Sequence, residues 1–71
     1  MPLPPSALSD LLPAEQARVR ALIPVFLAAG FCGAPAVVMM ERDLQLADMA
    51  IDSGDAAAML RAYNRLHGYR E

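Results

Sequence analysis

The stretch ALIPVFLAAGFCGAPAVVMM, residues 21–40, carries no charged side chain, and its most polar side chain is the thiol of Cys32. A continuous α-helix of this length spans about 30 Å, which is enough to cross the hydrocarbon core of a bilayer. Four residues that break or end helices interrupt it: Pro24, Gly30, Gly33 and Pro35. Glycines followed by proline indicate a turn. We therefore expect two helices of a folded core joined by a corner near Phe31, with a single membrane span over 21–40 as an alternative.

The composition limits the architecture. The chain has 71 residues, of which 56% are hydrophobic, and its aromatic residues are two Phe and two Tyr. A chain of this length forms one domain at most and buries only about 60% of the surface that its unfolded form exposes. Its apolar content is mainly Ala, Leu, Met, Val and Ile, a composition typical of helix bundles. We expect a small all-α fold.

Charge and cysteine content exclude some classes of protein. The net charge of −2 is too small to direct the molecule towards polyanions or polycations. A single cysteine excludes an intramolecular disulfide, so stability must come from helix packing, a partner chain or lipid. Every basic residue is Arg, and alanines are frequent, which favours a GC-rich bacterial or phage genome.

The predicted organisation is an N-terminal arm followed by three helices. Three prolines among the first five residues predict an extended or short-turn arm over 1–12. Proline is favoured at the first position of a helix, so Pro13 indicates the start of the first helix. The predicted helices cover residues 13–29, 35–52 and 55–67, with Ser53 or Asp55 as the cap of the third. Residues 13–71 then form a single three-helix bundle with the helix 35–52 at its centre.

The helix 35–52 has a narrow polar stripe formed by Glu41, Gln45, Asp48 and Asp52. Most of its remaining circumference is apolar, and such a helix is normally covered on more than one side. The third helix has a predicted buried face made of Ala56, Met59, Leu60, Tyr63 and Leu66, which His67 could extend. The first and third helices are too short to cover the second completely. We therefore expect a second copy or another protein to cover it.

No catalytic constellation is visible in the sequence. One His and one Cys provide no second member for a Cys/His pair or a metal site. We interpret Cys32 as a small buried residue of the turn and His67 as a helix-end residue. The acidic stripe is a solvated face or a docking strip for a basic partner. We expect no enzyme activity, no cofactor and no bound metal.

The favoured function is a non-catalytic interaction module, such as an adaptor, an antagonist or other regulator, or an assembly factor. It would act in the cytoplasm through apolar surface of the first two helices. It would bind a protein partner or itself, with a homodimer as the simplest arrangement. The residues expected at the interface are Phe26, Leu27, Val38, Met39 and Leu46.

A regulator that binds nucleic acid is the alternative. Ala50 and Gly54 have the spacing of a helix-turn-helix motif, and three arginines could contact phosphates: Arg61, Arg65 and Arg70. However, the positions next to the glycine are Ser53 and Asp55, where the motif is usually apolar. The supposed recognition helix also opens with DAAAML, which offers no side chain that reads base edges.

Overall fold

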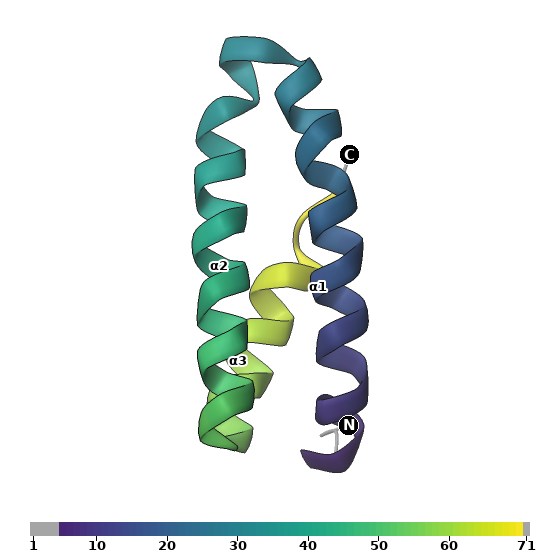
Figure 1. The fold of residues 1–71 in the computed structure, drawn as a ribbon, viewed down its shortest axis with the longest axis vertical. Helices are drawn as coiled ribbons and strands as arrows, with labels where there is room; N and C mark the ends of the chain where they lie inside the picture. Colours follow the sequence, from purple (N-terminus) through teal and green to yellow (C-terminus); the bar gives the residue numbers. More distant parts are fainter. Residues whose placement is uncertain (1–4, 71) are drawn as a thin grey trace.

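The computed structural model describes residues 5–70 as a three-helix bundle (Figure 1). The elements are α1 (Pro5–Ala28), the short 3₁₀ helix η1 (Gly30–Cys32), α2 (Ala34–Ser53) and α3 (Ala56–His67). No strand occurs within residues 5–70. The molecule measures 38 × 20 × 16 Å. The prediction of a small all-α three-helix bundle is therefore confirmed.

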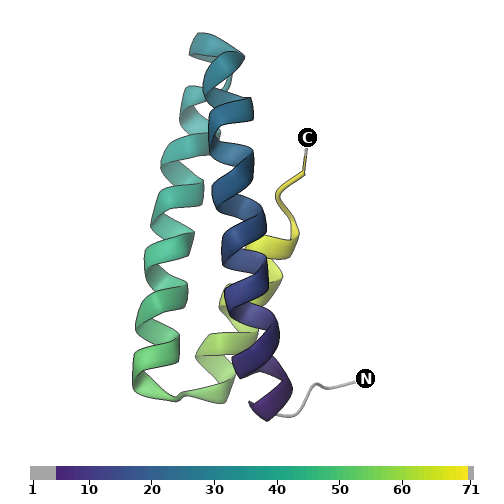
Figure 2. The ribbon, with the colours of Figure 1, turned by 45° about the vertical axis from the view of Figure 1, so that its right-hand side comes forward.

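The helices α1 and α2 form a long antiparallel hairpin, with η1 at its tip (Figure 1). The shorter α3 turns back from the end of α2 and lies along the part of the hairpin that is far from this tip (Figure 2). Each of the three helices packs against both others. Because α3 is short, the part of the hairpin near η1 extends beyond it.

The corner forms where the glycines predict it. Gly30 has a φ of +72°, in the left-handed region that side chains with a Cβ adopt only with strain. Gly33 is buried, and a Cβ at this position would collide with the carbonyl oxygen of Phe26. Residues 21–40 are thus divided among α1, η1 and α2. Within residues 5–70, no helix has the length and apolar character that crossing a bilayer requires.

The predicted N-terminal arm over 1–12 is wrong for residues 5–12, which form the first turns of α1; residues 1–4 lie outside the described part of the chain. Leu8 and Leu12 are buried in the core. A proline inside a helix costs about 3 kcal/mol, whereas burying two leucines is worth about 3–6 kcal/mol in total. Pro13 also lies on the exposed side of α1. The helix therefore runs through Pro13 instead of beginning there.

The boundaries of α2 and α3 agree with the prediction to within one residue. The amide of Gly54 donates to the carbonyls of Ala50 and Ile51, which ends α2. The side chain of Asp55 accepts hydrogen bonds from the amides of Ala57 and Ala58, at 3.0 and 3.3 Å. Asp55 is therefore the cap of α3, one of the two residues expected in that role.

Residues from all three helices form the core. The side chains buried there are Leu8, Leu12, Val19, Leu22, Met40, Leu44, Ala47, Ala50, Met59, Ala62 and Leu66. The predicted buried face of α3 is wrong at Leu60, which is 39% exposed, and at His67, which is also exposed, while Ala62 is buried. Because α3 packs against α1 and α2 together, its buried face is turned towards Ala62, whose small side chain allows a close approach.

Candidate functional site

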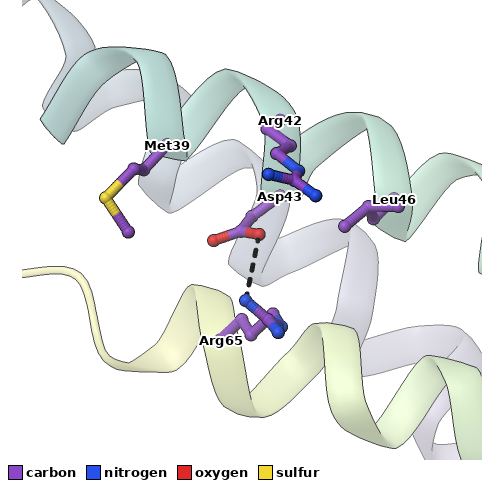
Figure 3. A pocket seen from close by; sticks show the side chains of 5 residues that line it. All are labelled: Met39, Arg42, Asp43, Leu46 and Arg65. Carbon is purple, nitrogen blue, oxygen red and sulfur yellow. Dashed lines mark ion pairs between the residues drawn. The ribbon is translucent and has the colours of Figure 1, made fainter. Parts of the chain in front are cut away.

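A groove runs along the seam between α2 and α3, and it consists of three adjoining hollows. The first is lined by Met39, Arg42, Asp43, Leu46 and Arg65 (Figure 3). The second is lined by Leu46, Ala58, Arg61, Ala62 and Arg65. The third is lined by Leu46, Met49, Ala50, Ser53 and Ala58. Leu46 lines all three, so we treat them as one surface, the α2–α3 groove.

The α2 side of this groove is an exposed row of residues that follows a heptad pattern. Met39, Leu46 and Ser53 are seven residues apart, and Arg42 and Met49 follow Met39 and Leu46 by three residues. This 3-and-4 alternation is the spacing of a coiled-coil seam. Met39 and Met49 are 57% and 59% exposed. We call these five residues the α2 strip; their heptad spacing is a signal that the sequence analysis missed.

Charges of opposite sign lie on the two sides of the α2 strip. On one side, α3 contributes Arg61 and Arg65, which line the groove. On the other side is the exposed acidic stripe predicted from the sequence, with Glu41, Asp48 and Asp52. The position of this stripe is fixed by α1, because Asp48 Oδ1 accepts a hydrogen bond from Gln16 Nε2 at 2.7 Å. The strip therefore separates an acidic flank beside α1 from a basic flank on α3.

The groove also contains a buried acid, Asp43, which the sequence analysis did not single out. Its Oδ2 accepts a hydrogen bond from the Tyr69 hydroxyl at 2.5 Å, and its Oδ1 lies 3.7 Å from Nη1 of Arg65 (Figure 3). Burial and the neighbouring carboxylate raise the pKa of Tyr69 to about 12. Asp43 therefore joins the C-terminal segment to α2 and compensates part of the charge of Arg65.

A second polar cluster holds the C-terminal end of α3 against α1. The guanidinium of Arg18 donates to the carbonyls of Leu66 and Tyr69, both at 2.8 Å, and pairs with Glu15 at 2.9 Å. The hydrogen bond from Arg18 holds the pKa of Glu15 below its usual range. His67 lies 3.5 Å from Glu15 and stacks on Tyr63. Arg18 thus joins the last turn of α3 and the segment after it to α1.

The polar groups inside the molecule are engaged with one another. Within residues 5–70, every buried side-chain nitrogen and oxygen has a hydrogen-bond partner. The same residues contain no group of three His, Cys, Asp or Glu side chains placed to hold a metal ion. The prediction that Cys32 is buried is wrong, because η1 lies at the tip of the hairpin and leaves the thiol exposed.

The groove is divided into hollows that are each smaller than a typical pocket for a small molecule. Its hollows have volumes of about 190, 240 and 280 Å³. Pockets for small molecules usually measure about 300–1,000 Å³ and enclose most of the ligand. An open seam between two helices, divided into small hollows, is instead the type of surface into which a further helix packs its side chains.

The residues predicted at the interface are distributed over more than one surface. Met39 and Leu46 line the groove, and Val38 is exposed beside the strip. Leu27 is exposed on α1, outside the groove, whereas Phe26 is half-buried and packs on the core. Phe31, which is not among the residues predicted at the interface, is 93% exposed at the tip of the hairpin.

Of the arginines proposed to contact nucleic acid, two are brought together. Arg61 and Arg65 line the second hollow, and Arg70 is exposed in the segment after α3.

Comparisons with protein-family models, with curated proteins and with solved structures find no match for this chain. The surface of the molecule is therefore the guide to its function.

Proposed function

We propose that this chain is a non-catalytic interaction module that associates with a second copy of itself through the α2 strip. The observation that carries the proposal is the exposure of Met39, Leu46 and Met49 on one side of α2, a helix that packs on the core through other residues. Covering a large apolar side chain completely is worth about 1.5–3 kcal/mol. Methionine also adapts well to contacts between proteins, because its side chain is flexible and polarisable.

The second copy is favoured as the occupant by the charges of the molecule. A single copy presents both an acidic and a basic flank beside the same apolar strip. Each flank is complementary to the other, so the surface as a whole is complementary to itself. Self-complementary surfaces are what two-fold symmetric dimers require, and most oligomers are symmetric.

Nucleic acid is a weaker candidate for the basic flank. Arg65 already lies beside the buried carboxylate of Asp43, so part of its charge is compensated within the molecule. Asp55 caps the start of α3, where a recognition helix would approach the phosphates and bases. Backbone phosphates dominate the affinity of proteins for nucleic acid, and an acidic side chain at this position would repel them.

The test is the molar mass in solution as a function of concentration, measured by light scattering and by sedimentation equilibrium. We expect a dimer that dissociates on dilution, and we expect Leu46→Glu to yield a monomer at every concentration. Leu60→Glu is the matched control, because Leu60 is 39% exposed and Leu46 is 40% exposed. This variant should dimerise normally. A wild-type chain that stays monomeric at its highest concentration would rule out the proposal.

A further inference from the structure

We infer that the two copies dimerise with their α2 helices parallel, about a two-fold axis that runs along the α2 strip. The inference depends on the proposed self-association and adds the orientation of the copies and the contacts between them. Heptad spacing is its first support, since Met39, Leu46 and Ser53 recur every seven residues. Two helices with this pattern can pack side by side over several turns, with the exposed residues of each filling spaces on the other.

The charged flanks determine the direction of packing. A two-fold axis along the strip exchanges the two flanks, so the acidic stripe of one copy faces Arg61 and Arg65 of the other. A two-fold axis that crosses the strip produces antiparallel helices instead. Each flank then lies opposite the same flank of the second copy, so acids face acids and arginines face arginines. Like charges in close opposition weaken an interface and opposite charges strengthen it, which favours the parallel arrangement.

The positions of the charged residues along the direction of α2 fit the parallel arrangement. Arg65 lies level with Asp43, to which it is paired, and Ala58 lines the third hollow together with Ala50. Arg61 is midway between Ala58 and Arg65 on α3, so it lies close to the level of residues 46–48. Parallel copies keep these levels aligned. Arg65 then approaches Glu41 of the second copy. Arg61 approaches Asp48 of the second copy, whose side chain stays 60% exposed although it pairs with Arg20 at 3.9 Å.

Arg42 is the charged residue of the α2 strip and its least favourable member, whereas Ser53, the other polar member, is uncharged. Arg42 lies near the proposed axis, so the two copies of Arg42 approach each other. A single polar residue in a coiled-coil seam lowers stability and fixes register and the number of chains. Its guanidinium can reach water while its methylene groups cover apolar surface. The parallel dimer is therefore expected to be specific in register and readily reversible.

Disulfide trapping tests the orientation directly. Met39→Cys and Met49→Cys are prepared separately in a Cys32→Ser background, because Cys32 is exposed and could form its own cross-link. Residues 39 and 49 are about 15 Å apart along a helix, and a disulfide requires Cα atoms within about 7 Å. In a parallel dimer, each variant forms a cross-linked dimer with itself under mild oxidation. When the two variants are mixed, no disulfide forms between position 39 of one copy and position 49 of the other.

An antiparallel dimer gives the opposite pattern. At most one of the two variants then links to itself, and the mixture forms the link between positions 39 and 49 where the axis crosses α2 near residue 44. That result would overturn the inference while the proposed self-association stands. A strictly monomeric wild-type chain would overturn both. Adding Leu46→Glu to each cysteine variant should abolish its cross-link, because the links must come from the dimer; links that persist come from random collision and would also count against the inference.

Discussion

Tyr69 donates a hydrogen bond from its hydroxyl to Oδ2 of the buried Asp43, at 2.5 Å, and so attaches the segment after α3 to the middle of α2. The other oxygen of Asp43 lies 3.7 Å from Arg65. Two groups from the C-terminal part of the chain thus compensate one buried carboxylate. Because a buried charge without partners is strongly unfavourable, these contacts fix the position of the α3 side of the groove.

Tyr69→Phe is expected to lower the free energy of unfolding by about 1–3 kcal/mol, because Asp43 stays buried and loses its hydroxyl donor. Urea denaturation followed by circular dichroism measures the change. Tyr63→Phe is the control, since Tyr63 is also half-buried but its ring stacks on His67 and does not contact Asp43. Equal losses in the two variants would show that the Tyr69 hydroxyl has no special role.

The same hydrogen bond predicts a loss of stability at high pH. Burial and Asp43 raise the pKa of Tyr69 to about 12, above the value of about 10 for an unfolded chain. A raised pKa means that the folded state favours the protonated hydroxyl. Its contribution is therefore complete below pH 10 and decreases as the pH rises from 10 to 12. Urea denaturation at several pH values should show this decrease in the wild type and a smaller one in Tyr69→Phe.

Arg18 and Arg20 are two residues apart on α1 and should differ sharply in their contribution to stability. Arg18→Gln removes donors to the carbonyls of Leu66 and Tyr69 at the end of α3, and we expect a loss of about 1.5–3 kcal/mol. Arg20 makes an exposed ion pair with Asp48 at 3.9 Å, so Arg20→Gln should cost less than about 1 kcal/mol. Thermal or urea unfolding compares the two, and an equal effect would contradict the role of Arg18 in joining α3 to α1.

The sequence predicted the parts of the fold that depend on local chemistry. Gly30 and Gly33 mark the corner because one needs a positive φ and the other leaves no room for a Cβ. Asp55 marks the start of α3 because its side chain satisfies the first amides of that helix. Such signals act over a few residues, so they can be recognised without knowledge of the rest of the structure.

The parts that depend on tertiary contacts could not be predicted in this way. Asp43 and Tyr69 are 26 residues apart, and nothing near either residue indicates the other. The groove likewise depends on the rotation of α3, which places Ala62 inside and Leu60 outside. The start of α1 is different, since Leu8 and Leu12 continue the helical spacing of Val19 and Leu22. Pro13 is a local signal for a helix start, and the packing of these leucines outweighs it.

Leu8 and Leu12 supply a direct test of the corrected N-terminal boundary. If residues 5–12 are part of the packed α1, Leu12→Ala should reduce the free energy of unfolding by about 2–5 kcal/mol, and Leu8→Ala should act similarly. Leu11→Ala is the control on the same turn, because Leu11 is exposed and should cost much less. Three equally small effects in urea denaturation would support a loose arm instead.

Arg42→Leu should strengthen self-association if the α2 helices pair in parallel. The substitution removes the approach of two like charges near the axis and adds an apolar side chain to each copy of the strip. A change of about 1.4 kcal/mol corresponds to a tenfold change in the dissociation constant, and partial burial of two leucines should provide at least that amount. Sedimentation equilibrium measures the constant, with Arg70→Leu as a control for added surface hydrophobicity, because Arg70 is exposed outside the strip and its flanks. A weaker dimer in Arg42→Leu would instead indicate that Arg42 binds an acidic group of the partner, and it would contradict the position of the axis along the strip.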